Sequence, residues 1–203
     1  MITDVIILSR TKMSGDKICV GGLDLKSGAM LRLLSNTAGA LTSGFPYKIG
    51  ETYTIEFSPR HIRTAPHIED VAVYDYKLSK VFNKIDLDTA VYQNAQNFDD
   101  LRGLFSSKLL WNNCKGYALE SDPPEFSVQI ATLNRNLVKN GAEYQEVGLF
   151  SPRRVKYVGE LDISKMPARI NSGTPVRFSL ARPWDKDGNG VKLCYLQLSG
   201  VYI

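Results

Sequence analysis

The basic residues of this sequence fall into two groups whose spacing suits the binding of an anionic chain. One group surrounds the first predicted turn, in "SRTKMSGDK", and continues onto nearby strands, and the other follows about one small domain later. Lysine and arginine side chains along a groove can neutralise the phosphates of a nucleic acid. We therefore predict a nucleic-acid-binding surface formed by Arg10, Lys12, Lys17, Arg32, Arg60, Arg153, Arg154 and Lys156.

Aromatic residues on the predicted strands would complete such a surface. A base that stacks on an aromatic ring gains about 1–3 kcal/mol with little dependence on sequence. We assign this role to Tyr53 and Tyr74 in the first half, and Tyr157 and Trp184 are similar candidates in the second. For any single residue an alternative stays open, because the cation could be a solvated strand-edge residue and the ring could belong to the core.

The only two histidines lie in "RHIRTAPHIED", close to two carboxylates. His61 and His67 with Glu69 and Asp70 could bind zinc or perform acid–base chemistry. A structural zinc site needs four ligands, and no cysteine lies near enough in the sequence to complete one. We favour a loop in which His67 hydrogen-bonds the carboxylates, and we expect neither a metal nor another cofactor.

Motifs that mark catalysis or nucleotide hydrolysis are absent from the sequence. It contains no G-x-S-x-G, no P-loop and no G-x-G-x-x-G. Cys19 and Cys194 lie in apolar predicted strands, where a thiol is usually inert packing. The polar stretch "DKDGNG", residues 185–190, lacks the later glutamate of a calcium loop, which favours a plain turn. These observations favour a non-catalytic protein.

Composition and length indicate a globular chain with room for two small domains. The 203 residues are 43% hydrophobic and 23% charged, and the net charge of +4 permits an anionic partner without requiring one. Three dispersed cysteines without C-x-x-C spacing indicate reduced thiols. The apolar run at residues 5–8 is too short for an export signal or a membrane span. We expect a soluble cytoplasmic protein with no membrane partner.

The elements that must position the candidate residues are mainly strands. Residues 5–8 form a continuous apolar run and residues 53–57 alternate, as buried and half-buried strands do. Helical spacing over 86–94 and 99–105 begins at an aspartate in each case, which suits an N-cap. The expected strands are 5–8, 18–25, 30–34, 53–57, 71–76, 126–133, 151–158, 176–180 and 192–203.

This pattern predicts two small Greek-key β-barrels in tandem, in a mainly β chain with a small helical insert. Because Pro123 and Pro124 break the preceding segment, we place the domains at residues 1–122, with the insert over about 86–110, and at 123–203. The segments "EFSPRHIR" (56–63) and "LFSPRRVK" (149–156) share F-S-P-R. We expect both to lie at the end of a strand, as duplicated barrels would place them.

Four segments that together span nearly the full chain add a family resemblance. They are "DVIILSRTK", "CVGGLDLKSG" with the following "RLL", "PHIEDV" (66–71), and the final "LCYLQLSGVYI". With these segments the chain resembles bacterial proteins described as dual-OB-fold domains. The resemblance implies two OB-like Greek-key barrels and nucleic-acid binding, in an accessory role in bacterial nucleic-acid processing or antiviral defence. It implies no catalytic residue.

Three functional hypotheses follow from the sequence. The leading one is a non-catalytic module that binds single-stranded DNA or RNA through its basic loops and aromatic residues. The second is an adaptor that binds a partner protein, which the modest net charge and the apolar character of residues 87–110 favour. The third is an enzyme built on the cluster of histidines and carboxylates.

Overall fold

The chain forms a mainly β structure made of two compact units. The computed structural model describes residues 1–61, 63–148, 150, 152–186 and 188–203, with 47% strand and 11% helix. The first unit comprises Met1–Arg63 and Glu69–Asn94, and the second comprises Thr64–Ile68 and Ala95–Ile203. By internal packing the chain thus enters the second unit at Thr64–Ile68 and again after Asn94, and the domain boundary after residue 122 stays a prediction.

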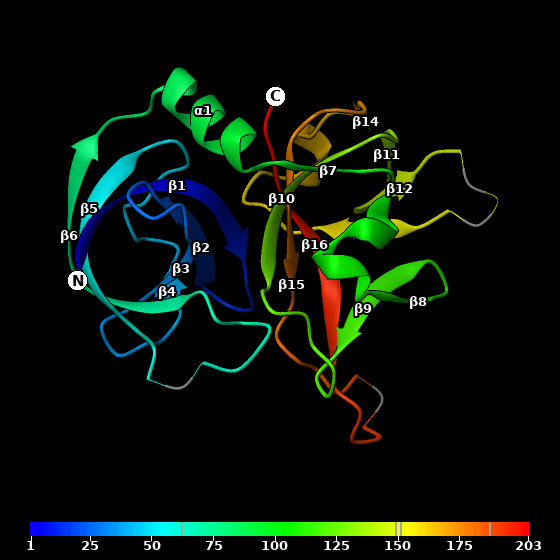
Figure 1. The fold of residues 1–203 in the computed structure, drawn as a ribbon, viewed down its shortest axis with the longest axis horizontal. Coiled ribbons are helices and arrows are strands. Elements are labelled where there is room, and N and C mark those ends of the chain that lie inside the picture. The colour runs from blue at the N-terminus through cyan, green and yellow to red at the C-terminus, as the bar shows by residue number, and fades with distance from the viewer. Residues whose placement is uncertain (62, 149, 151, 187) are drawn as a thin grey trace. The chain divides into compact units, whose positions relative to one another are not determined.

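The first unit contains a closed five-stranded β-barrel (Figure 1). Its strand order is β1-β5-β6-β3-β2, and the pairing of β1 with β2 closes the ring. The pairing of β3 with β6 is parallel, and the other pairings are antiparallel. The short strand β4 pairs with β2 in addition. The elements are β1 (Ile2–Lys12), β2 (Lys17–Asp24), β3 (Met30–Leu34), β4 (Leu41–Thr42), β5 (Thr52–Pro59), β6 (Asp70–Lys80) and the helix α1 (Lys84–Asn94).

Alternating apolar side chains fill the barrel of the first unit. Val5 and Ile7 of β1 point inward, and β1 changes its pairing register with β2 between Ile7 and Ser9. A close approach of two backbones explains one glycine in β2. A Cβ at Gly22 would lie 2.4 Å from the Val5 side chain and 3.0 Å from the Ile6 carbonyl oxygen. This position therefore tolerates no side chain.

The second unit is a large sheet with short extensions. Its order is β14-β11-β12-β13-β9-β16-β15-β10-β7; β8 pairs with β9, and β13 also pairs with β16 in parallel. A core that includes Phe105, Tyr144 and Phe178 lies against it. The strands are β7 (Gln96–Phe98), β8 (Leu110–Asn112), β9 (Lys115–Leu119), β10 (Val128–Leu133), β11 (Leu137–Asn140), β12 (Glu143–Glu146), β13 (Arg154–Tyr157), β14 (Arg169–Ile170), β15 (Val176–Leu180) and β16 (Leu193–Val201), with 3-10 turns η1 (Leu101–Gly103), η2 (Phe105–Ser107) and η3 (Ile163–Lys165).

The mainly β class is confirmed, and α1 confirms the helix expected over residues 86–94. The helix expected over 99–105 is wrong. This segment forms two 3-10 turns, because Phe105, Ser106 and Ser107 adopt φ values of 53°, 57° and 59°, which end any right-handed helix. Strands β8 and β9 lie in a region where the sequence pattern predicted none.

The two F-S-P-R segments lie at different places in their units, so the expected equivalence is wrong. In the first unit Pro59 is the last residue of β5. In the second, Pro152 and Arg153 precede β13, which begins at Arg154. Ile62 of the first segment and Leu149 and Ser151 of the second lie outside the described residues, as does Asp187 of the polar turn.

Candidate nucleic-acid interface

Arg10 and Tyr53 of the first unit are buried, at 7% and 3% exposure. The Arg10 guanidinium donates hydrogen bonds to the carbonyl oxygens of Ser43 (3.0 Å), Phe45 (2.9 Å) and Tyr47. The Tyr53 hydroxyl lies 2.6 Å from a Glu51 carboxylate oxygen. Arg10 therefore holds the 43–47 loop against the barrel, and Tyr53 belongs to an aromatic core.

Arg32 and Arg60 share one buried carboxylate. Asp70 is 1% exposed, and its Oδ1 accepts from the Arg32 guanidinium, while Arg60 Nη1 lies 3.5 Å from its Oδ2. The Arg32 side chain is only 13% exposed, and that of Arg60 is 44% exposed. Arg32 is thus occupied by Asp70, and Arg60 keeps part of its surface open.

Lys12, Lys17 and Tyr74 are exposed. The two lysines lie on either side of the turn from β1 to β2, where Lys12 is paired with Ile18. Tyr74 of β6 places its hydroxyl 2.8 Å from Ser58 Oγ. The structure therefore brings the two lysines together at one turn and leaves Tyr74 on a different strand pair.

The histidine–carboxylate cluster is divided between the units. His67 belongs to the second unit, where its Nε2 lies 3.1 Å from the Leu180 carbonyl oxygen, while Glu69 and Asp70 belong to the first. Across the described ranges of the chain, histidine, cysteine, aspartate and glutamate form no group of three or more that could hold a metal ion. In the same ranges, no helix combines the length and the apolar character that crossing a bilayer requires.

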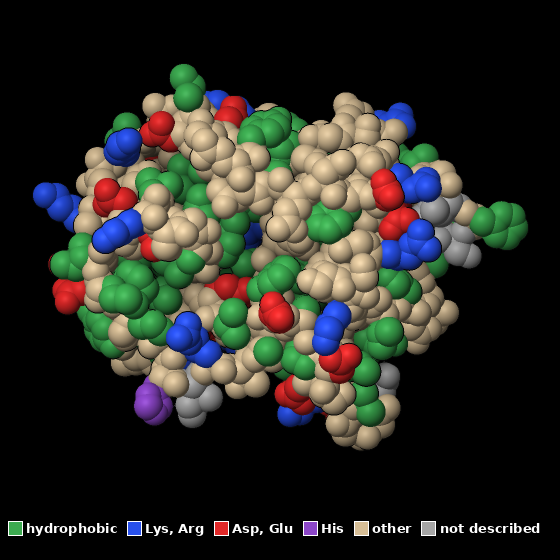
Figure 2. All heavy atoms as spheres, viewed as in Figure 1, with side chains coloured by type: hydrophobic (Ala, Val, Ile, Leu, Met, Phe, Trp, Pro, Cys, Tyr) green, Lys and Arg blue, Asp and Glu red, His purple; other side chains and the backbone are tan. Residues whose placement is uncertain are grey.

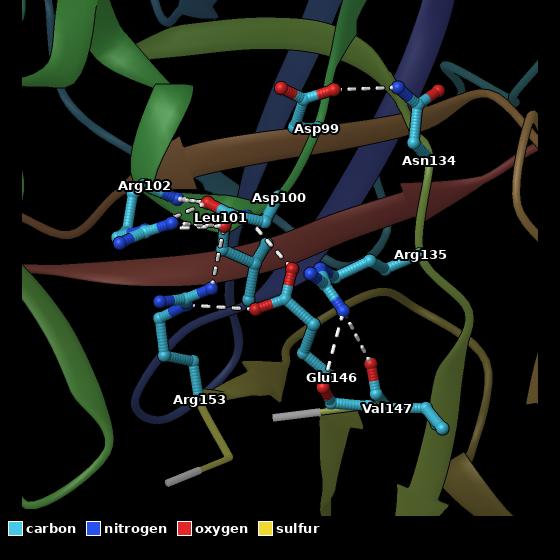
Figure 3. A network of polar contacts seen from close by, with 10 residues as sticks. Asp99, Asp100, Leu101, Arg102, Asn134, Arg135, Glu146, Val147 and Arg153 are labelled. Carbon is cyan, nitrogen blue, oxygen red and sulfur yellow. Dashed lines mark hydrogen bonds and ion pairs between the residues drawn. The ribbon is translucent and has the colours of Figure 1, made fainter. Parts of the chain in front are cut away.

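Arg153, the second-unit arginine of F-S-P-R, is the centre of a buried ionic network (Figure 3). Its Nε donates to Glu146 Oε2 at 2.8 Å, and its Nη2 lies 2.9 Å from Asp100 Oδ2. The guanidinium also lies 5.5 Å from the ring centroid of Trp111. With a side chain only 12% exposed, Arg153 links β12 and β13 to the η1 turn and offers little surface to a ligand.

The pKa values of the two carboxyl groups in this network are shifted in opposite directions. Burial raises the pKa of Glu146 above its usual value, although the Leu101 amide and Arg153 act against the rise. Burial also acts to raise the pKa of Asp100, but hydrogen bonds from Arg102 and the charge of Arg153 outweigh it, so that pKa is lowered. Asp100 is therefore the more strongly held anion of the pair.

Arg154 and Lys156 lie on the opposite face of β13 from the core. Val155 between them is 1% exposed and belongs to the core, so period-two alternation turns its neighbours outward. Arg154 is paired with Lys115 of β9, and Lys156 with Gln197 of β16. These pairings place three cations on one face of the sheet.

Three aromatic rings lie on the same face. Tyr117 of β9 is paired with Tyr195 of β16, and their ring centroids are 6.2 Å apart. Trp184 follows at 6.5 Å from Tyr195 and is 57% exposed. Cross-strand partners share a face, and Lys115 lies two residues before Tyr117 on the same strand. We call this surface the β9–β13–β16 face, formed by Lys115, Tyr117, Arg154, Lys156, Trp184 and Tyr195.

One carboxylate, that of Glu143, lies beside two of these cations, because Glu143 is also the cross-strand partner of Lys156. Lys115 Nζ lies 3.7 Å from a carboxylate oxygen of Glu143, a half-exposed pair of modest strength. Within the described part of the chain, the buried Nε of Arg154 has no hydrogen-bond partner. On the side of the molecule shown in Figure 2, Lys and Arg are interspersed with Asp and Glu. The β9–β13–β16 face combines three cations with three aromatic rings.

Sequence reasoning found Arg154, Lys156 and Trp184 but missed Lys115, Tyr117 and Tyr195. The missing signal was the alternation of polar and small residues in "KGYAL", which is β9, and of apolar and aromatic residues in "LCYLQL" of β16. Only the pairing of β9 with β16 brings the two tyrosines together.

Comparison with known proteins identifies no family. No family model matches the chain, and no curated protein matches it. Among solved structures, one described as "Structure of murine DNA binding protein bound with ds DNA" aligns with 98% of this chain and 99% of its own, at 10% identity and a TM-score of 0.31. A similarity at this level carries no argument about the function of this chain.

Proposed function

We propose that this protein is a non-catalytic module that binds single-stranded nucleic acid on the β9–β13–β16 face of its second unit. The observation that carries the proposal is the row formed by Tyr117, Tyr195 and Trp184 beside three cations. Phosphates would contact Lys115, Arg154 and Lys156, and bases would stack on the rings. A single strand is the expected ligand because its bases offer ring faces that a duplex keeps stacked.

The topology of both units supports this location. The first barrel has the strand order of an OB-like Greek-key barrel, with a parallel pair formed by its third and fifth strands, β3 and β6. In the second unit β10 pairs with β15, and β11, which follows it directly in the sequence, pairs with β12. If β10 and β11 are two halves of one first strand, the ring β10/β11-β12-β13-β16-β15 has the same order, with the parallel pair β13–β16.

In OB-like barrels, ligands bind over the second and third strands and at the loops between strands one and two and between strands four and five. In the second unit these are β12 and β13, and Trp184 lies in the loop between β15 and β16. In the first unit Lys12 and Lys17 flank the first of these loops, between β1 and β2, and Arg60 lies in the second, between β5 and β6. We therefore keep these three cations as a second contact region, in a chain of two tandem OB-like barrels of the dual-OB type.

Four other predicted site residues have structural roles in this proposal, and the exposed Tyr74 lies outside the proposed contact regions. The Arg10 guanidinium is occupied by loop carbonyls, and Arg32 by Asp70. Tyr53 packs in the core, and Arg153 holds Asp100 and Glu146 together. None of these side chains is required to contact the nucleic acid.

A protein–protein adaptor is the second candidate, and the first unit carries the observation that favours it. Large apolar side chains before and within α1 are exposed: Val81 at 69%, Phe82 at 55%, Ile85 at 75% and Tyr92 at 59%. Such residues are typical of protein contact surfaces. A partner protein that stays bound after nuclease treatment, and is lost on Phe82→Ser/Ile85→Ser, would support the adaptor.

The test of the leading proposal is fluorescence anisotropy with labelled single-stranded RNA, single-stranded DNA and duplex DNA. We expect binding to a single strand that weakens in the Arg154→Ala/Lys156→Ala variant. The matched control, Lys165→Ala/Arg169→Ala, removes the same two charges from the exposed surface of η3 and β14 and should bind normally. Equal affinities of the two variants, with both folded by circular dichroism, would refute the proposed face.

A further inference from the structure

A cavity of about 550 Å³ lies in the second unit, lined by residues from 97 to 111. This volume is in the range of small-ligand sites, roughly 300–1,000 Å³. The lining combines two aromatic side chains, Phe98 and Trp111, with polar ones that include Asp99, Arg102 and Ser107. The cavity is open to solvent, and its lining is polar and apolar in about equal parts, which suits a ligand that carries both a planar ring and polar groups.

Each of the two rings is seated against a glycine. A Cβ at Gly116 would lie 2.9 Å from the Trp111 ring, and a Cβ at Gly103 would lie 2.7 Å from the ring of Phe98. Arg153 lies 5.5 Å from the Trp111 ring centroid and is itself held by buried carboxylates. Both rings are therefore fixed before any ligand arrives, which reduces the entropic cost of binding.

The backbone beside the cavity is strained. Phe105, Ser106 and Ser107 are three consecutive non-glycine residues with left-handed φ values, a costly conformation for L-residues. The Phe105 amide donates to Gln129 Oε1 at 2.9 Å, which helps to hold the turn. Strain of this kind is often found at functional sites, and here it positions Ser107 in the cavity lining.

Three charged side chains line the cavity, and the carboxylate of one of them, Asp100, is already paired with Arg102 and Arg153. Asp99 Oδ1 accepts from Asn134 Nδ2 at 2.8 Å, and within the described residues its Oδ2 has no partner. Arg102 pairs with Asp100 at 2.8 Å, and its side chain is 66% exposed. The cavity thus offers one acceptor carboxylate and one guanidinium open to solvent.

We propose that this cavity binds a single purine nucleotide and prefers guanine. The base would lie against Phe98 and Trp111, which suit a planar ring system. Guanine carries two adjacent donors on its pairing edge, N1–H and N2–H, and Asp99 is the acceptor that matches them. Arg102 would contact the phosphate. Adenine and cytosine each lack this pair of donors, so the carboxylate selects against them.

The cavity is distinct from the β9–β13–β16 face. In the β8–β9 hairpin Trp111 is paired with Gly116, while Lys115 and Tyr117 alternate to the other side of β9. Binding of a nucleotide here therefore does not depend on the proposed function. The ligand could be a free nucleotide or one guanosine of a bound strand, and both share the same chemistry.

The two tryptophans of the chain allow a direct test. In a Trp184→Phe variant Trp111 is the only tryptophan, so its fluorescence reports on the cavity. We expect saturable quenching by GMP, with AMP and CMP at least about tenfold weaker, because a hydrogen bond to a charged group is among the stronger ones. Quenching by GMP that is not saturable up to millimolar concentration would overturn the proposal.

Variants then separate the two polar contacts. Asp99→Asn keeps an oxygen that accepts the hydrogen bond from Asn134, and it should remove the preference for GMP over AMP. Arg102→Gln should weaken the binding of both nucleotides alike. Lys165→Gln, at an exposed lysine of η3, is the control and should leave GMP binding unchanged. An Asp99→Asn variant that still prefers GMP to AMP would refute the assignment of Asp99.

Two further comparisons identify the source of the nucleotide and keep the two proposals apart. If the cavity binds a guanosine of a bound strand, a single strand that contains guanosine should quench Trp111 more than a strand without guanosine. If the cavity binds free GMP, both strands should quench Trp111 equally little. GMP binding should survive Arg154→Ala/Lys156→Ala. Strand binding that is unchanged in this variant, with GMP quenching intact, would overturn only the face, whereas strand binding that depends on Arg154 and Lys156 without saturable quenching by GMP would overturn only the cavity.

Discussion

Replacing Arg153 by methionine tests whether this residue is structural. The change keeps a long apolar stem and removes the guanidinium that Glu146 and Asp100 share. Glu146 is 0% exposed and Asp100 is 4% exposed, so both carboxylates would lose a partner in a place that water hardly reaches. Removing one partner of a buried ion pair typically costs about 3–5 kcal/mol.

We expect the lower end of that range, about 3 kcal/mol, because Asp100 keeps Arg102 and Glu146 keeps the Leu101 amide. The matched change Glu146→Gln keeps the acceptor for the Leu101 amide and leaves Arg153 paired with Asp100. It should cost only about 1 kcal/mol. The double variant Arg153→Met/Glu146→Gln should lose less unfolding free energy than the sum of the losses in the two single variants, since the two side chains interact directly.

Urea unfolding measures these free energies, and Trp111 fluorescence in the Trp184→Phe background reports on the second unit. Nucleic-acid affinity is measured on the same folded variants. A loss of less than about 1 kcal/mol in Arg153→Met, together with a clear loss of affinity, would show that Arg153 faces the ligand and would refute the structural role.

Three further predictions concern other parts of the chain. Arg10→Met should lower the unfolding free energy of the first unit by about 3 kcal/mol in urea titrations, because three backbone carbonyls lose a charged donor. Tyr195→Ala should weaken single-strand binding by about 1–3 kcal/mol in anisotropy titrations, since one stacking surface is lost. The pKa of Asp100 is lowered below its ordinary 3.8, so its stabilisation is complete above that pH and is lost as the pH falls through the lower folded value. Asp100→Asn should therefore reduce the loss of stability between about pH 4 and about pH 2 in urea titrations.

Strands were readable from the sequence where apolar residues alternate or run together. The pattern around Val155 correctly predicted a strand with Arg154 and Lys156 beside it, and alternation then turned both outward. The short strands β8 and β9 were missed because three and five residues carry too little periodicity to identify. The helix expected over 99–105 failed because a left-handed turn at Phe105 has no signal in apolar spacing.

The roles of the basic residues depended on partners far away in the sequence. Arg10 looks like any strand-end cation until the 43–47 loop supplies carbonyls more than thirty residues later. Arg153 looks equivalent to its neighbour Arg154, yet Asp100 binds it from more than fifty residues away. Local sequence cannot separate such structural arginines from ligand-facing ones, since the difference is made by tertiary contacts.

The most direct test of the proposed face is the salt dependence of single-strand binding. For single strands the logarithm of affinity falls by about 0.7 per neutralised phosphate for each logarithmic unit of salt. The three cations of the face therefore contribute about −2 to the slope, which by itself is a roughly 20-fold fall in affinity between about 50 and about 200 mM salt, and contacts to the first unit would make the slope steeper. Arg154→Ala/Lys156→Ala removes two of these contacts and should make the slope shallower by about 1.4, while Lys165→Ala/Arg169→Ala keeps the original slope. Equal slopes for wild type and the Arg154→Ala/Lys156→Ala variant would contradict the account.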